Sequence, residues 1–89
     1  MGYPVIRGIA PSQGDRKDRF TAIINGDRFT GSTNANLGPS IEITKFTVVD
    51  DGTISIKVEI GGLAATGLRD VTVTHPRGDG VLTGGFEVF

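Results

Sequence analysis

The stretch IEITKFTVVDDGTISIKVEI, residues 41–60, predicts two strands joined by a tight turn. In its second half every second residue from Ile54 to Ile60 is apolar, and the residues between them are polar or charged. This period of two is typical of a strand that buries one face, so Ile56 and Val58 are expected to point into the same core. The first half is rich in β-branched and aromatic residues, and the Asp-Asp-Gly between the halves has the composition of a hairpin turn.

The rest of the chain shows the same kind of pattern. Four further segments are predicted as strands, namely residues 4–9, 19–26, 69–75 and 81–89. No segment has a convincing helical period of 3.6 residues. Six or seven short strands separated by Gly, Pro, Asn and Asp predict an all-β sandwich or barrel, and the length of 89 residues favours the sandwich.

The composition excludes several classes of function. A chain of 89 residues is expected to form one domain, residues 1–89, with one modest core and no cleft between domains. Nine Lys and Arg against ten Asp and Glu give a net charge of -1, so no basic surplus exists to bind nucleic acid. Cysteine and tryptophan are absent, so the core has no disulfide and packs aliphatic residues and phenylalanine. No apolar run is long enough for membrane insertion, and the N-terminus lacks the features of a signal peptide.

Turn and core motifs at both ends of the chain suggest a family. PVIRGIAPSQG (residues 4–14) carries a Pro-Ser-x-Gly turn, IINGDRF (23–29) carries a Gly-x-x-Phe step, and RDVTVTHPRGDGVLTGGFEVF (69–89) runs through a Pro-x-Gly turn into a strand with an aromatic residue. These segments resemble the IPT/TIG domains, and residues 34–60 are similar to versions found in bacterial surface and secreted proteins. The resemblance spans nearly the whole chain.

The IPT/TIG resemblance implies a fold more than a function. It implies an immunoglobulin-like β-sandwich of about seven strands without a disulfide. The family includes DNA-binding members, receptor ectodomain modules and spacers beside sugar-processing enzymes, and the DNA-contacting loop of the family has no counterpart in this sequence. It favours an extracellular, cell-surface or virion location, and no functional residue is carried over from it.

The tripeptide Arg77-Gly78-Asp79 is interpreted as part of the turn between the last two strands. Pro76 sets φ, Gly78 and Gly80 permit positive φ, and Asp79 can cap the turn with its side chain. Such a hairpin tip is also where integrin-binding motifs lie. Since a three-residue match is frequent by chance, integrin binding is not expected.

The run GDRKDR, which begins at Gly14, is the other candidate contact loop. Its charges alternate in sign, which is typical of a solvated loop rather than a phosphate cradle, and it is a candidate polar rim for a partner. The candidate contact residues are Asp15, Arg16, Lys17, Asp18, Arg19, Arg77 and Asp79.

No catalytic, cofactor or metal residue is predicted. His75 is the sole histidine and is expected to be a surface residue at a strand end, although Asp79 could approach it across the turn. Asp50 and Asp51 are expected to serve the hairpin turn, because a calcium site needs more oxygen ligands than this spacing supplies. Without cysteine or a Gly-x-Ser-x-Gly elbow, the usual nucleophilic triads cannot be assembled, so the chain is expected to be non-enzymatic.

Two function hypotheses of different class follow. The first is a structural module that binds a protein partner in a larger assembly, such as a virion capsid, a tail or a cell-surface layer; the start at Met1 and the end in a closing strand at Phe89 suit a complete small protein. The second is an accessory domain of a secreted or cell-surface protein that binds a ligand or carbohydrate by stacking sugars on aromatic side chains. Against it, the chain has five Phe, one Tyr and no Trp, and only Tyr3 is expected to be available.

Overall fold

The computed structural model describes residues 4–89, which form eight strands and no helix. The strands are β1 (Val5–Ala10), β2 (Gln13–Gly14), β3 (Arg19–Asp27), β4 (Asn34–Asn36), β5 (Ile41–Asp50), β6 (Thr53–Ile60), β7 (Gly67–Thr74) and β8 (Gly80–Val88). All six strands expected from the sequence are present within two residues of their predicted ends. The two additions, β2 and β4, are two and three residues long, too short to show a period in the sequence.

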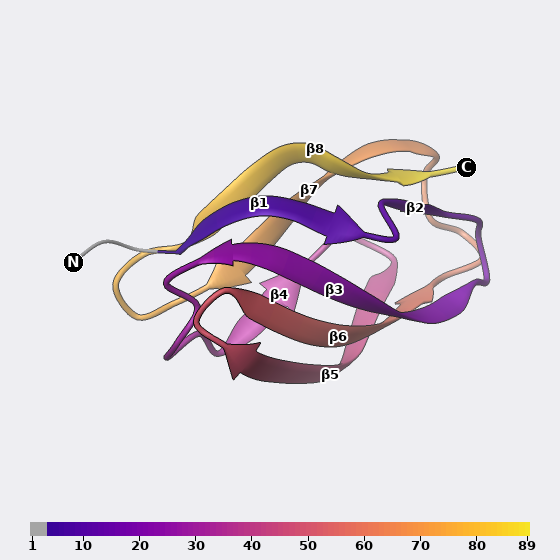
Figure 1. Cartoon of the computed structure of the whole chain (residues 1–89). Helices are drawn as coiled ribbons and strands as arrows, with labels where there is room; N and C mark the ends of the chain where they lie inside the picture. The colour runs from indigo at the N-terminus through magenta and orange to yellow at the C-terminus, as the bar shows by residue number, and fades with distance from the viewer. Residues whose placement is uncertain (1–3) are drawn as a thin grey trace.

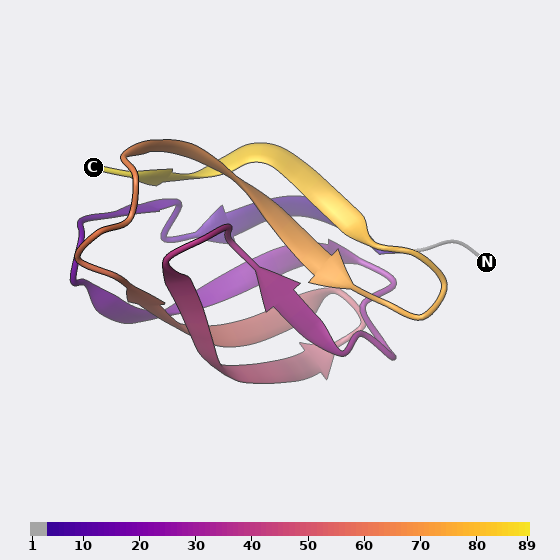
Figure 2. The same ribbon diagram turned by 180° about the vertical axis from the view of Figure 1, so that it is seen from behind.

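The strands form two four-stranded sheets in the orders β1-β3-β6-β5 and β2-β8-β7-β4, packed in a sandwich-like arrangement (Figures 1 and 2). All pairs are antiparallel except β2 with β8, which is parallel. The chain passes from the first sheet to the second between β1 and β2, across the cis Ala10–Pro11 peptide bond. An all-β sandwich-like fold is therefore confirmed.

The core between the sheets is built from the alternating residues that the sequence predicted. Ile56 and Val58 are each 1% exposed and share the inner face of β6 with Ile54 and Ile60. Val71 and Val73 of β7 and Phe86 and Val88 of β8 cover them from the other sheet. Within residues 4–89 no polar or charged residue is buried, so apolar packing alone fills the interior.

Strand β5, which the sequence predicted from its β-branched and aromatic residues, is interrupted by two bulges. Its register against β6 shifts between Ile43 and Lys45 and again between Val48 and Asp50. Each shift is a bulge that inserts one extra residue into β5, so apolar side chains three positions apart still face the core. Phe46 can in this way pair with Ile56 and pack against the core together with Ile43.

Two arginines close the end of the sandwich at which β6 ends and β7 begins. The Arg69 guanidinium donates to the carbonyls of Leu37, Pro39 and Ala65, at 3.4, 2.9 and 3.0 Å. The Nε of Arg16 donates to the carbonyl of Ala64 at 2.8 Å. These hydrogen bonds satisfy loop carbonyls that have no partner in a neighbouring strand, and so they fix the loops in place. We call this end of the sandwich the far end.

Candidate functional site

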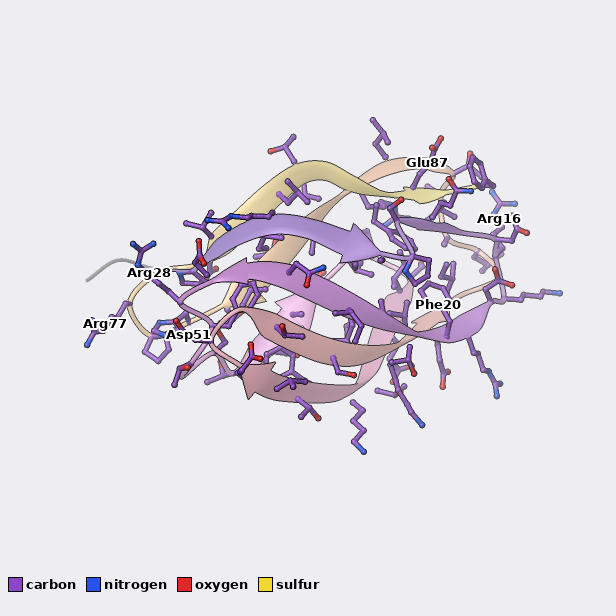
Figure 3. All side chains as sticks on the ribbon, in the orientation of Figure 1. Arg16, Phe20, Arg28, Asp51, Arg77 and Glu87 are labelled. Atoms are coloured by element: carbon purple, nitrogen blue, oxygen red, sulfur yellow. The ribbon has the colours of Figure 1, made fainter. Side chains whose placement is uncertain are left out.

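Three loops meet at the opposite end of the sandwich, and we call them the tip loops: residues 28–33, 51–52 and 75–79. They meet because β3, β5 and β7 run in the same direction, so that all three strands end at the left of Figure 1. Figure 3 shows Arg28, Asp51 and Arg77 gathered there, with Arg16 and Glu87 at the far end. The fold thus brings together residues that lie about 50 positions apart in the chain.

Hydrogen bonds fix the tip loops to one another. The Phe29 N–H donates to the Asp51 carbonyl at 2.9 Å, and the Thr30 N–H donates to Oδ1 of Asp51 at 3.2 Å. The Thr33 N–H donates to the Thr74 carbonyl at 2.9 Å. The Phe29 side chain is fully buried and anchors the first loop in the core. The loops are therefore part of the folded framework rather than free segments.

The His75 imidazole bridges two of these loops. Its Nδ1 accepts a hydrogen bond from the Arg77 N–H at 3.0 Å, and its Nε2 lies 3.0 Å from the Thr30 carbonyl. Because the Thr30 carbonyl can only accept, Nε2 is the donor in the second of these hydrogen bonds. Asp79 contacts the His75 backbone N–H, at 3.4 Å, rather than the ring. His75 thus lies partly exposed directly after the end of β7, as the sequence predicted, and it also links two of the loops.

The tip loops border a surface cavity of about 460 Å³ that is largely open to solvent, which we call the tip cavity. It is lined by Arg28, Thr30, Gly31, Asp51, His75, Pro76 and Arg77. A second cavity, of about 410 Å³ at the far end, is lined by two cations, Lys17 and Arg19, and by two carboxylates, Glu42 and Glu59. The tip cavity has two arginines and one carboxylate in its lining, so its charges do not cancel.

Asp51 is the ionised carboxylate of this cavity. Hydrogen bonds from the side chain and the backbone N–H of Thr30, with smaller contributions from the Arg28 backbone and charge, lower the pKa of Asp51 below its ordinary value. These interactions favour the charged form. Asp51 thus holds the first tip loop through a charge-assisted contact.

The lowered pKa of Asp51 predicts an acid-dependent loss of stability. A depressed folded-state pKa contributes stability above the unfolded-state pKa, and that contribution is lost as the pH falls through the folded-state value. Asp51→Asn keeps an oxygen for the Thr30 N–H but cannot ionise. We expect the free energy of unfolding of wild type to fall more steeply than that of Asp51→Asn between about pH 5 and about pH 2. Parallel curves from denaturant titrations at each pH would contradict this role.

The Arg77-Gly78-Asp79 segment forms a turn as expected at Gly78 and Asp79, whereas Gly80 differs from the expectation. The Gly78 N–H donates to the His75 carbonyl at 3.0 Å, and Gly78 has a φ of 133°. Asp79 accepts a hydrogen bond from the turn through its side chain. Gly80, however, does not have the positive φ that the sequence suggested; a β-carbon there would instead meet the carbonyl oxygen of Pro4.

Replacing Gly78 with Val is expected to lower the free energy of unfolding by roughly 1 to 3 kcal/mol. The reason is that a β-branched residue adopts a positive φ only at a steric cost. Asp79→Glu, which alters reach but not charge, serves as the matched control and is expected to change stability by less than about 0.5 kcal/mol. Equal thermal midpoints for Gly78→Val and wild type would show that the turn tolerates a side chain at this position.

The structure places the second candidate contact loop at the far end, away from Arg77 and Asp79. Asp15 and Asp18 close this turn, with the Asp15 N–H donating to Oδ2 of Asp18 at 2.9 Å. The Lys17 N–H donates to the Ile60 carbonyl at 2.8 Å, and Arg16 reaches Ala64. Arg19 is the first residue of β3 and is exposed. The run is therefore an anchored loop rather than a purely solvated one, and it forms no common surface with the tip.

The aspartates of the β5–β6 turn are used as turn residues. Oδ1 of Asp50 accepts a hydrogen bond from the Gly52 N–H at 2.9 Å. Oδ1 of Asp51 accepts one from the Thr30 N–H. Across residues 4–89 no group of three or more His, Cys, Asp or Glu side chains is close enough to hold a metal ion. Nor does this part of the chain contain a helix long and apolar enough to cross a membrane.

Sequence reasoning missed Arg28 and Thr30. Arg28 lies within the Gly-x-x-Phe step that ends at Phe29, and Thr30 follows it, but nothing in this segment indicates contact with residues 51 or 75. Their place depends on the register of β3 against β6, which pairs Asn25 with Thr53 and so sets the β5–β6 turn beside the end of β3. Only the register between β3 and β6 could have revealed that Arg28 and Thr30 belong to the site.

Comparison with known proteins gives no family for the chain. No protein-family model matches it, and no curated protein is similar to it in sequence. The IPT/TIG resemblance therefore gains no support from these comparisons.

Proposed function

We propose that the chain is a non-catalytic interaction module of the immunoglobulin type, which attaches to a partner protein in a larger assembly through its tip loops. The observation that carries this proposal is the set of three loops at the end of an apolar sandwich, which hydrogen bonds fix to one another and which border the open tip cavity. Binding residues commonly lie on loops that a rigid scaffold positions.

The strand order supports the immunoglobulin assignment. Constant-type immunoglobulin domains have one sheet in the order A-B-E-D and a second with strands C, F and G. Labelled in chain order, β1, β3, β6 and β5 correspond to A, B, E and D, and β4, β7 and β8 correspond to C, F and G. In this assignment β2 is a second segment of strand A that has moved to the edge of strand G.

The same assignment supports a binding role for the tip. The tip loops then correspond to the B–C, D–E and F–G loops, and the B–C and F–G loops of antibody variable domains take part in antigen binding. The larger assembly expected from the sequence, a virion or a cell-surface layer, stays a prediction. Integrin binding through Arg77-Gly78-Asp79 stays outside this proposal, because His75, Gly78 and Asp79 are used in the turn itself.

No observation favours the carbohydrate-binding alternative. Sugar binding by stacking needs exposed aromatic rings. Phe86 is buried and its ring stacks on Phe20 with centroids 6.0 Å apart, and Phe29 is also buried. Within residues 4–89 the exposed aromatic residue is Phe89, at 51%. Tyr3, the residue expected to be available, lies outside the described residues.

Site-specific photo-crosslinking in the source organism tests the proposed function. A benzoylphenylalanine at position 77 reports contacts of the tip, and the same residue at position 57, on the outer face of β6, is the matched control. We expect a defined protein adduct from position 77, identified by mass spectrometry, and none from position 57. Adducts at neither position, or the same adducts at both, would contradict binding through the tip.

A further inference from the structure

We propose that His75 is a pH-sensitive switch within the tip loops. When the imidazole gains a proton, the hydrogen bond from the Arg77 N–H to its Nδ1 is lost, while the hydrogen bond from its Nε2 to the Thr30 carbonyl is kept. Acid thus releases the turn at residues 75–79 from the ring and leaves the ring attached to the loop at residues 28–33. The inference goes beyond the proposed function, because this change takes place with or without a bound partner.

The two hydrogen bonds of the ring require one particular protonation state. A backbone N–H can only donate, and a backbone carbonyl can only accept. The Arg77 N–H lies 3.0 Å from Nδ1, so Nδ1 carries no proton when this bond is made. The Thr30 carbonyl lies 3.0 Å from Nε2, so Nε2 carries the proton of that bond. Only the neutral imidazole with its proton on Nε2 makes both hydrogen bonds.

Protonation affects the two sides of the ring differently. In the imidazolium both ring nitrogens are donors. The new Nδ1–H then faces the Arg77 N–H, and two donors in this position repel each other. Nε2 remains a donor, and its hydrogen bond to the Thr30 carbonyl becomes charge-assisted and therefore stronger. The added proton breaks one contact of the ring and reinforces the other.

Packing confines the Nε2 side of the ring. A β-carbon at Gly31 would lie 3.1 Å from Nε2, so the ring edge lies close to the backbone of the loop at residues 28–33. Nδ1, in contrast, is bonded to its own turn, two residues further along the chain. The conformational change on protonation is therefore expected in the turn, at Arg77, rather than at Thr30 or Gly31.

Two cations and two carboxylates lie around the ring. Arg28, Asp51 and Arg77 line the tip cavity with it, and Oδ1 of Asp79 accepts from the His75 backbone N–H at 3.4 Å. These charges oppose one another, so the lone pair of Nδ1 decides which form of the ring fits the turn. The ring is partly exposed and can exchange protons with solvent. Histidine is the side chain that changes its charge between about pH 5 and about pH 8.

Nuclear magnetic resonance of the ¹⁵N-labelled full chain tests the switch between about pH 8 and about pH 5.5, above the range in which aspartates ordinarily titrate. At the upper end we expect the ring spectrum to show the proton on Nε2. We also expect a through-hydrogen-bond coupling between the Arg77 amide nitrogen and Nδ1. As the pH falls, this coupling should disappear, and the Arg77 amide resonance should move with the same midpoint as the ring resonances.

Two variants assign the response to the ring. His75→Asn places a side-chain oxygen where Nδ1 accepts, so it keeps an acceptor for the Arg77 N–H but cannot gain a proton. Its Arg77 amide resonance is expected to stay constant over the same pH range. Asp79→Asn keeps the ring and removes the carboxylate of the same turn, and it is expected to respond as wild type does. Amide spectra establish that each variant is folded.

The outcomes decide the proposal on wild-type protein first. A neutral ring with its proton on Nδ1, or an Arg77 amide that stays constant while the ring titrates, would overturn the switch. A pH response in His75→Asn equal to that of wild type, or its loss in Asp79→Asn, would assign the response to another group and also overturn it. None of these results depends on crosslinks from position 77, which test the proposed function separately.

Discussion

Replacing Phe29 with Ala is expected to lower the free energy of unfolding by about 3 to 5 kcal/mol. Phe29 has no exposed surface and is the one tip-loop residue in the apolar core. Its backbone also donates to the Asp51 carbonyl and accepts from the Ser32 N–H, so the cavity left by the ring lies directly under the loop. A small domain has only about 5 to 15 kcal/mol in total, so this one change removes a large share of the stability.

The measurement is chemical denaturation of purified protein, followed by far-ultraviolet circular dichroism. Phe29→Leu keeps most of the apolar volume and is expected to lose less stability than Phe29→Ala. A variant with wild-type stability would mean that Phe29 is not packed in the core.

The second large effect is expected at the centre of β6, where Ile56→Ala should cost about 2 to 4 kcal/mol. Ile56 is 1% exposed and pairs with Ala22 of β3 on one side and Phe46 of β5 on the other. A cavity at this point is surrounded by paired strands, which relax little. The midpoint of denaturant unfolding measures the loss.

Two variants of the same strand serve as comparisons. Val58→Ala is expected to destabilise in the same direction as Ile56→Ala, since both side chains point into the core. Ser55→Ala changes a residue of the outer face and is expected to shift stability by less than about 0.5 kcal/mol. If Ser55→Ala were as damaging as Ile56→Ala, the inner and outer faces of β6 would be assigned the wrong way round.

The strands could be predicted from the sequence because burial of one face imposes a period of two. That period identified β6 without ambiguity, and the Val-x-Val and Phe-x-Val patterns located β7 and β8. The period of two could not predict the bulges of β5, because an inserted residue appears in the sequence only as a break in alternation. The strands β2 and β4 are set by pairing with β8 and β7, which a local pattern does not contain.

The candidate site could be predicted only in part. The turn at Arg77-Gly78-Asp79 was expected from its Pro and Gly content, and the involvement of Asp51 in a turn from the Asp-Asp-Gly sequence. The convergence of Arg28, Thr30 and His75 on these turns depends on sheet order and register, which are long-range properties. Residues 15–19 were predicted as a contact loop from their charge pattern alone. In the structure they lie at the far end, and most of them form hydrogen bonds within the domain.

The parallel pairing of β2 with β8 has a mechanical consequence. Near the start of the chain, the Ser12 and Gly14 carbonyls accept hydrogen bonds from the Glu87 and Phe89 N–H groups of the last strand, at 2.9 and 3.0 Å. Tension that pulls the N-terminal strand and the C-terminal strand apart along the 38 Å axis slides β2 and β8 past each other. Sliding loads these hydrogen bonds together, whereas peeling would break them one after another. The geometry of this pairing is therefore that of shear, in which both hydrogen bonds are loaded at the same time.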